Sequence, residues 1–305
     1  MTRRKLLLFL VKIIVSFLVL WAVYTYLGSA ETWEKMQNAS MSWILAGAVC
    51  VVCVQVAKAW RFREFTRVLG QSVPFSRCLL AHLIVPILGF VTPGKLGEGA
   101  KVFYLKTSKR ELGFLFIVER IQDMLILLAV AGFGFAFSEF YVLSYLVLLG
   151  AVAVGFGLFL RLDWFLNRIT RILLKKQYFT ENWFMEKSRA LLRPRFIAAS
   201  ALTLLVWGIT FGSSYCFARA VAVDLSYPKV ALVFSWAVIM GLVSSLPGGV
   251  GVREGGITVF FEKIYGVARP AGTAVAAINL AVHYIVLTLT AAIGYLIYKS
   301  IEKDS

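Results

Sequence analysis

The sequence of 305 residues contains little charge, few cysteines and almost no histidine. Charged residues make up only 16% of the chain and hydrophobic residues make up 60%, a composition that excludes an ordinary soluble domain. The only histidines are His82 and His283, far apart in the sequence, and Cys50 and Cys53 form a CxxC pair with no second pair nearby. We therefore expect no metal, no cofactor and no redox centre, and we interpret the cysteines as small apolar side chains.

Long apolar runs are the main feature of the sequence. A helix needs about 20 apolar residues to cross roughly 30 Å of hydrocarbon. Runs near or above that length cover residues 6–27, 43–59, 112–137, 141–160, 196–217 and 271–298. The first run has the basic start and small-residue end of a signal peptide, but its apolar stretch is too long for one and indicates a retained helix. We predict an all-α, polytopic integral membrane protein with about six full spans.

Acidic residues are also scarce, at 16 against 32 lysines and arginines, and the formal net charge is +16. The bases gather at the start of the chain, after the run 43–59 (Arg61, Arg63 and Arg67), after residue 105, and in the interval 161–195. Basic loops stay on the cytoplasmic side of a membrane, so we expect a protein of the cytoplasmic (plasma) membrane with both termini in the cytoplasm. The interval 161–195 alternates bases with apolar residues at helical spacing, which predicts a cytoplasmic amphipathic segment on the membrane surface. This topology accounts for the positive charge without a nucleic-acid partner.

Two further apolar windows, residues 79–106 and 229–262, are interrupted by glycine and proline. Each window is too long for one crossing and too short for two. We expect both to form re-entrant helical hairpins, which a membrane tolerates only where protein or a water-filled cavity surrounds the broken backbone. If both hairpins cross completely, the number of spans rises to about eight.

The two interruptions repeat one motif. Residues 92–101, "TPGKLGEGAK", and residues 246–254, "LPGGVGVRE", share the pattern Pro-Gly-x-aliphatic-Gly, with a glutamate and a base close behind. Under the predicted topology the spans that flank the two motifs run in opposite directions. We therefore predict one transmembrane domain, residues 1–305, built from inverted-repeat halves at about 43–137 and 196–298.

The chemistry of this motif favours an anion. Proline and glycine open the backbone, and a half-helix that begins after such a turn directs unpaired N–H groups and its positive dipole end toward phosphate or carboxylate. Glycines that only permit close helix packing are the alternative, but charges at bilayer depth cost about 2.5–3.5 kcal/mol each and favour a functional site. The candidate substrate-binding residues are Pro93, Gly94, Lys95, Gly97, Glu98, Lys101, Pro247, Gly248, Gly249, Gly251, Arg253 and Glu254.

A third polar cluster lies in "VERIQD", residues 118–123. Glu119 and Asp123 are four residues apart and share one face of a helix, with Arg120 beside them. These side chains could simply mark the membrane interface, but apolar residues continue on both sides of them. We predict an inward-facing network with Lys101 or Arg253 that gates or couples transport, with proton coupling as one hypothesis.

The segments "LGFVTPGKLGEGAKVFYL", "VERIQD" and "LPGGVGVREGG" occur in this order and resemble the lysylphosphatidylglycerol synthase transmembrane-region family over nearly the whole chain. Members that synthesise the lipid carry a soluble acyltransferase-like domain after the membrane part, whereas this sequence ends at "YKSIEKDS" after its last apolar run. The resemblance therefore implies the role of the membrane half, which moves a lipid with a polar headgroup between leaflets. Lys101 stands where the family often has arginine, so the identity of the headgroup does not carry over.

From these observations we expect a lipid flippase that is not an enzyme and has no catalytic residue. Its partners would be lipids with phosphate headgroups, whether anionic, aminoacylated or polyprenyl-phosphate-linked, and a homo-oligomer is compatible with the sequence. An ion-coupled carrier of a small anionic solute is the alternative, because an inverted repeat serves both functions. A membrane-embedded enzyme acting on lipid phosphates is a weaker alternative, because the acids stand beside bases and the histidines are far apart.

Overall fold

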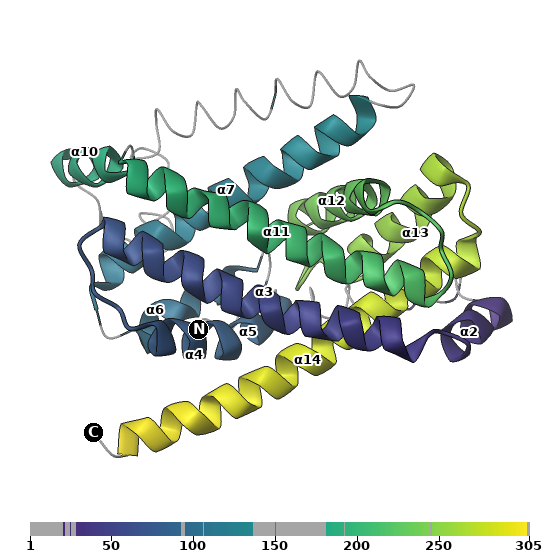
Figure 1. Ribbon diagram of the computed structural model, residues 1–305, viewed down its shortest axis with the longest axis horizontal. Coiled ribbons are helices and arrows are strands. Elements are labelled where there is room, and N and C mark those ends of the chain that lie inside the picture. Colours follow the sequence, from purple (N-terminus) through teal and green to yellow (C-terminus); the bar gives the residue numbers. More distant parts are fainter. Residues whose placement is uncertain are drawn as a thin grey trace, which may run out of the picture. The chain divides into compact units, whose positions relative to one another are not determined.

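The computed structural model of the chain describes residues 29–92, 95–105, 107–136, 181–191, 193–244 and 246–303, together with residues 21, 25 and 150. The elements of this part of the chain are helices, as the sequence predicts (Figure 1). They are α2 (Ala30–Gln37), α3 (Met41–Val68), α4 (Phe75–Ile84), α5 (Pro86–Val91), η1 (Leu96–Ala100), α6 (Lys101–Tyr104), α7 (Lys109–Ala136), α10 (Glu181–Ala190), α11 (Pro194–Ala220), α12 (Tyr227–Val243), α13 (Val252–Tyr265) and α14 (Arg269–Lys303). The predicted spans 6–27 and 141–160 and residues 161–180 of the basic segment lie outside the described residues, apart from the three single residues.

The chain forms two compact units, each assembled from separate stretches of sequence. Unit 1 contains Met1–Val56, Leu79–Lys101 and Gly208–Ser305, and unit 2 contains Ala57–Cys78 and Val102–Trp207. Both Pro-Gly motifs fall in unit 1, and the acidic cluster at 119–123 falls in unit 2. The division into inverted-repeat halves stays a prediction.

Unit 1 is organised around α13, which contacts α12 on one side and α14 on the other, while α14 also contacts α2 and α5. Small residues allow the close approach. A Cβ atom added to Gly256 of α13 would lie 3.5 Å from Ala237 of α12, and one added to Gly272 of α14 would lie 3.4 Å from Thr258 of α13. Such contacts are typical of helices that pack within a membrane, where van der Waals contact replaces the hydrophobic effect.

Three described helices are long and apolar enough to cross a bilayer: α3, α11 and residues Arg269–Ile301 of α14. Helix α7 has 28 residues and therefore roughly the length needed, at about 1.5 Å per residue, but it carries Glu119, Arg120 and Asp123 in its interior. The described residues thus support a polytopic membrane protein, and the total of six spans stays a prediction.

Helix α3 is longer than the sequence analysis predicted. The apolar run ends at residue 59, but the helix continues to Val68 and includes Arg61, which is fully buried. Gly70, two residues after the helix, has a left-handed φ of 78° and caps its C-terminus. The Gly70 N–H donates to Arg67 O (3.1 Å), and the Gln71 N–H donates to Thr66 O (2.9 Å). The predicted apolar run is therefore shorter than the helix, because a helix ends at its capping residue and not at its first charge, and the cytoplasmic side of Arg61 stays a prediction.

The two interrupted windows break at the motifs that the sequence identified. In the first window α5 ends at Val91, and the chain resumes as the short helices η1 and α6. In the second window α12 ends at Val243 and α13 begins at Val252. The breaks are thus confirmed as features of the chain, and their re-entrant position in a membrane stays a prediction.

Candidate functional site

The two Pro-Gly motifs meet in unit 1. The Gly248 N–H donates a hydrogen bond to Thr92 O at 3.4 Å, which joins the second motif to the residue that precedes the first. A Cβ atom on Gly248 would lie 2.9 Å from Phe90 O, and the residue has a left-handed φ of 61°. Both the φ value and the close contact with Phe90 require glycine at position 248, so this residue of the motif is explained by the contact between the two motifs. Pro93 and Gly94 themselves lie outside the described residues.

The first motif is held by a short hydrogen-bonded turn. The Thr92 hydroxyl donates to Leu88 O at 2.8 Å and accepts from the Gly97 N–H at 2.6 Å. This turn leaves Lys95 with a left-handed φ of 57°, an uncommon conformation for a residue with a side chain. Uncommon backbone conformations of this kind cluster at functional sites.

Two other predicted residues of the first motif are buried beside this turn. Glu98 in η1 is 8% exposed and packs on α5, where a Cβ atom on Gly89 would lie 2.9 Å from its Cγ. Lys101, three residues later, is 3% exposed. Both are thus buried in the same unit as the second motif.

The second motif forms the start of α13. Gly251 is the N-cap residue, and its N–H donates to Glu254 Oε2 at 2.7 Å. The other carboxylate oxygen, Oε1, accepts from Arg253 Nε at 2.8 Å and lies 2.7 Å from Arg253 Nη2. The Glu254 carboxylate therefore occupies the helix start that the sequence analysis expected to be left for an anionic ligand.

Arg253 is the charged residue of this motif that keeps unused hydrogen-bonding capacity. Its side chain is 7% exposed, and its Nη2 atom makes no hydrogen bond despite the short distance to Glu254 Oε1. The ion pair with Glu254 compensates the buried guanidinium charge, but its Nη2 hydrogens are not aligned with the carboxylate oxygen. An anion in the neighbouring space could therefore accept a further hydrogen bond from Nη2.

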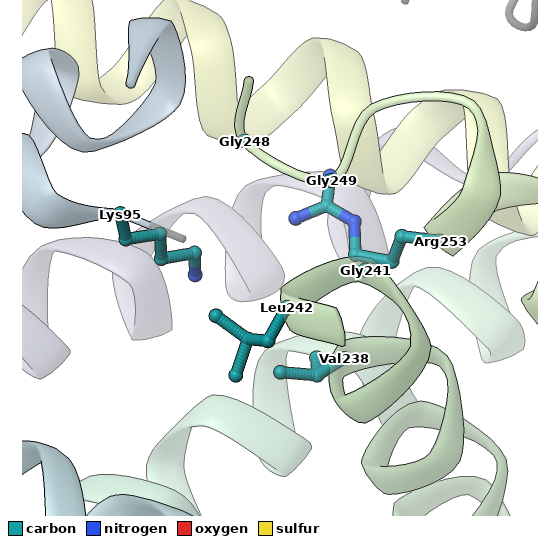
Figure 2. A pocket seen from close by; sticks show the side chains of 7 residues that line it. All are labelled: Lys95, Val238, Gly241, Leu242, Gly248, Gly249 and Arg253. Atoms are coloured by element: carbon teal, nitrogen blue, oxygen red, sulfur yellow. The ribbon is translucent and has the colours of Figure 1, made fainter. Parts of the chain in front are cut away.

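A pocket joins the two motifs. It holds about 250 Å³ of space, including the adjoining opening, and its walls are Lys95, Val238, Gly241, Leu242, Gly248, Gly249 and Arg253. Figure 2 shows the side chains of Lys95 and Arg253 extending into this space from opposite sides, with Val238 and Leu242 of α12 below them. The pocket is therefore lined by two cationic groups, the Lys95 ammonium and the Arg253 guanidinium, and by the apolar side chains of Val238 and Leu242.

Phe90 was missed by the sequence analysis and links the two cations. Lys95 Nζ lies 5.9 Å and Arg253 Cζ lies 5.8 Å from the centre of its ring. Tyr284 of α14 packs on the same ring at a centroid distance of 4.7 Å. An aromatic face attracts cations, so Phe90 stabilises two like charges near each other. Aromatic residues form 14% of the sequence, and no sequence signal distinguishes this one.

The predicted acidic cluster forms a separate network in unit 2. Arg61 of α3 is fully buried and donates to Glu119 Oε1 at 3.0 Å and to Asp123 Oδ1 at 2.7 Å. Arg120 Nη2 lies 3.1 Å from Asp123 Oδ2. The sequence analysis expected Lys101 or Arg253 as the partner of these acids; the observed ion-pair partners of Asp123 are Arg61 and Arg120, while Arg253 is paired with Glu254.

Helix α11 completes this network. Trp207 Nε1 donates to Asp123 Oδ1 at 3.1 Å, and Gln122 exchanges hydrogen bonds with Ser200 (2.8 Å) and Thr203 (3.1 Å). These contacts bring together two acids, two arginines and an indole donor. Its geometry is that of a buried polar contact joining α3, α7 and α11.

The sequence matches the family described as "Lysylphosphatidylglycerol synthase TM region" over residues 9–291. Similar proteins include a UPF0104 membrane protein of Methanocaldococcus jannaschii, 21% identical over 94% of this chain and 94% of that protein. Another is a UPF0104 membrane protein of Pyrococcus horikoshii, 21% identical over 95% of this chain and 96% of that protein. A third, from Methanothermobacter thermautotrophicus, is 22% identical over 87% of this chain and 88% of that protein. The chain is thus an integral membrane protein that belongs to the lysylphosphatidylglycerol synthase transmembrane-region family.

Proposed function

We propose that this protein is a translocase that moves lipids with a phosphate group between the leaflets of the cytoplasmic membrane. The two interrupted windows enter the membrane as re-entrant hairpins, and both termini face the cytoplasm. The lipid phosphate binds in the pocket between the Pro-Gly motifs while the apolar tails remain in the bilayer. Transport involves binding and movement of an intact lipid and no catalytic step.

The observation that carries this proposal is the pair of cations at the pocket, one from each motif. Lys95 and Arg253 border the same space, and the Arg253 Nη2 atom lies 2.7 Å from Glu254 Oε1 without being aligned for a hydrogen bond to it. Cations in an apolar protein interior are costly unless an anion or a hydrogen-bond acceptor neutralises them. A phosphate group supplies both, since its oxygens accept several hydrogen bonds and carry negative charge.

The remaining motif residues support this site in the proposal. Glu254 orients Arg253 and caps α13, while Gly248 and Gly249 keep the backbone close to the pocket. The network around Arg61 holds α3, α7 and α11 together through its ion pairs and hydrogen bonds. Its gating or proton-coupling role, predicted from the sequence, is not required for phosphate binding.

Leaflet exchange in proteoliposomes tests the proposal. Phosphatidylglycerol that carries a dithionite-sensitive fluorescent label on one acyl chain is reconstituted with the purified protein. Dithionite reduces the label only in the outer leaflet, so the rate of the further loss of fluorescence measures how fast lipid moves there from the inner leaflet. The critical variant is Arg253→Gln with Glu254→Gln, because the double substitution leaves no unpaired buried carboxylate. The matched control is Lys229→Gln, which removes one charge from an exposed residue of α12.

Wild type and Lys229→Gln should both exchange the lipid, and the double variant should do so at least about tenfold more slowly. Exchange that is equally fast in the double variant would rule out the pocket as the transport site. A folded wild-type protein without exchange of any phosphate lipid would refute translocation itself.

One alternative is a carrier of a small anionic solute, because two cationic side chains at a pocket can bind a soluble phosphate or carboxylate as well as a lipid phosphate. The two functions differ in competition experiments. Soluble glycerol phosphate displaces the ligand of a solute carrier at the same concentration as the intact lipid, whereas a lipid translocase requires the apolar part for affinity.

A further inference from the structure

Two of the four cysteines are in contact with each other in unit 1. Cys50 lies in α3 and Cys216 lies in α11, and their thiols form a side-chain hydrogen bond. Cys50 is partly exposed and Cys216 is buried. The sequence shows Cys50 only beside Cys53, because its contact with Cys216 depends on how distant helices pack.

The start of α3 is held to the end of α11 next to this pair. The Ser40 N–H, directly before α3, donates to the O atom of Ala220, the last residue of α11, at 2.8 Å. The rings of Trp43 and Tyr215 lie edge to face, with their centroids 6.3 Å apart. The two helices therefore pack against each other within unit 1.

A glycine allows a closer approach one turn before Cys50. The fully buried ring of Phe217 occupies the place of a Gly47 side chain, since an added Cβ atom would lie 2.3 Å from Phe217 Cε1. Gly47 precedes Cys50 by three residues, and Phe217 directly follows Cys216. The two thiols thus meet inside a close helix contact of the kind that small residues permit.

This geometry favours a disulfide between the helices over one within α3. A disulfide needs Cβ atoms about 3.5–4.5 Å apart. Cys50 and Cys53 are three residues apart in one continuous helix, where Cβ atoms are about 5–6 Å apart and the backbone bonds oppose a closer approach. The hydrogen-bonded thiols of Cys50 and Cys216 need only a small side-chain movement to form the bond.

We propose that Cys50 and Cys216 are a redox-reactive pair, which a low-molecular-weight disulfide oxidises to a protein disulfide that joins α3 to α11 within unit 1. This disulfide restrains the contact between the two helices, so that sliding of one helix along the other at this position requires the reduced pair. The proposal does not depend on the proposed function, because it involves no lipid and none of the residues at the pocket.

The reaction consists of two thiol–disulfide exchanges. The Cys50 thiolate, as the more exposed of the two, attacks one sulfur of the reagent, forms a mixed disulfide and releases one reagent thiolate. The Cys216 thiolate then attacks the Cys50 sulfur, forms the protein disulfide and releases the second reagent thiolate. The protein loses two protons to the solvent and two electrons to the reagent, whose S–S bond is broken.

The predicted topology places the pair on the side of the membrane where disulfides persist. With the basic end of α3 in the cytoplasm, the start of α3 and the end of α11 lie toward the opposite surface. Cys216 is four residues from the end of α11, or about 6 Å along the helix. Thiols on that side meet an oxidising environment, whereas cytoplasmic thiols are kept reduced.

Stoichiometric oxidation of the reduced, full-length protein in detergent tests the pairing. One equivalent of 4,4′-dithiodipyridine is added at roughly pH 9, where ionised thiols make exchange faster. Absorbance measures the released thiopyridone, and mass spectrometry of the unreduced protein and of its tryptic peptides identifies the products. Trypsin places Cys50 and Cys53 in one peptide, residues 36–58, and Cys216 in another, residues 196–219.

We expect the wild type to release about two thiopyridones per reagent molecule, to retain no pyridyl adduct and to yield a linked pair of these peptides. The matched control is Cys53→Ser, which removes an exposed thiol one turn from Cys50 and should give the same products. Cys50→Ser and Cys216→Ser should each release about one thiopyridone and retain an adduct, because no second thiol displaces it.

Three results would overturn the proposal: a retained adduct in the wild type, a disulfide within peptide 36–58, or linked peptides that persist in Cys50→Ser. Thermal unfolding of each reduced variant, compared with the reduced wild type, verifies that the serine variants are folded. Because leaflet exchange is measured with the reduced protein, the pairing can be refuted while translocation stands, and translocation can be refuted while the pairing stands.

Discussion

Replacement of Arg61 by methionine should destabilise unit 2 strongly. Methionine retains most of the side-chain length and removes the guanidinium that pairs with Glu119 at 3.0 Å and with Asp123 at 2.7 Å. Breaking a buried ion pair by removing one partner costs about 3–5 kcal/mol, because the remaining charge stays buried. Asp123 still has Arg120 at 3.1 Å and Trp207 Nε1 at 3.1 Å, so we expect the loss to stay within that range.

Thermal unfolding of the protein in detergent, followed by tryptophan fluorescence, measures this effect. At about 2–4 °C per kcal/mol, a loss of about 3–5 kcal/mol lowers the apparent Tm by about 6–20 °C. The matched control is Arg67→Met on the same helix. Its side chain is 36% exposed and pairs with Glu64 one turn away, so its loss should cost about 0–1 kcal/mol.

A second substitution separates charge from packing. Adding Glu119→Gln to Arg61→Met removes the buried negative charge that the first change exposes, and it should restore about 2 kcal/mol. If Arg61→Met lowers the apparent Tm no more than Arg67→Met does, the buried pairing of Arg61 is not a source of stability. If the double variant is less stable than Arg61→Met alone, the cost comes from lost packing and the electrostatic argument fails.

Two further predictions concern the backbone and the surface. Gly249→Ala should destabilise the protein more than Gly266→Ala in the same unfolding assay. Both residues have a left-handed φ, but a Cβ atom on Gly249 would lie 2.7 Å from Gly241 Cα, whereas one on Gly266 meets nothing within 4 Å. Equal losses of stability would mean that backbone strain alone, and not this contact, sets the cost. The hydrogen bond to Glu111 raises the pKa of Lys187 above its ordinary value of 10.5, so this stabilisation is present below that pH and is lost as the pH rises through the higher value in the folded state. The apparent Tm of the wild type should therefore fall more than that of Lys187→Met between about pH 10 and pH 12, and parallel curves would contradict the pairing.

The motif residues and the helical breaks could be predicted because their signals are local. Proline and glycine restrict or open the backbone wherever they occur, so the interruptions at 93–94 and 247–251 were visible without any tertiary information. The repeat of the motif also suggested that both copies serve one site. The bond between Gly248 and Thr92 and the pocket that Lys95 and Arg253 border show that the two motifs are adjacent, and their common binding role stays a prediction.

The partners of the charged residues could not be predicted, because they depend on packing between distant segments. Arg61 follows an apolar run and looks like a cytoplasmic base, yet its side chain is paired with acids 58 and 62 residues later in the chain. Glu254 has the spacing of a ligand-binding acid, but it is also the third residue of a helix that begins with glycine, where a carboxylate caps the backbone. The positions of acids and bases in the sequence therefore identified the polar regions but did not identify which acid pairs with which base.

The two polar regions differ in how their charged side chains are arranged. Around Arg61, each of the two carboxylates has an arginine within 3.1 Å. At the pocket, Glu254 is paired with Arg253, and the described lining residues include Lys95 and Arg253 and no acid. A phosphate group could accept hydrogen bonds from both of these cationic side chains, which is the reason that the proposed function places the ligand at the pocket and not at the network around Arg61.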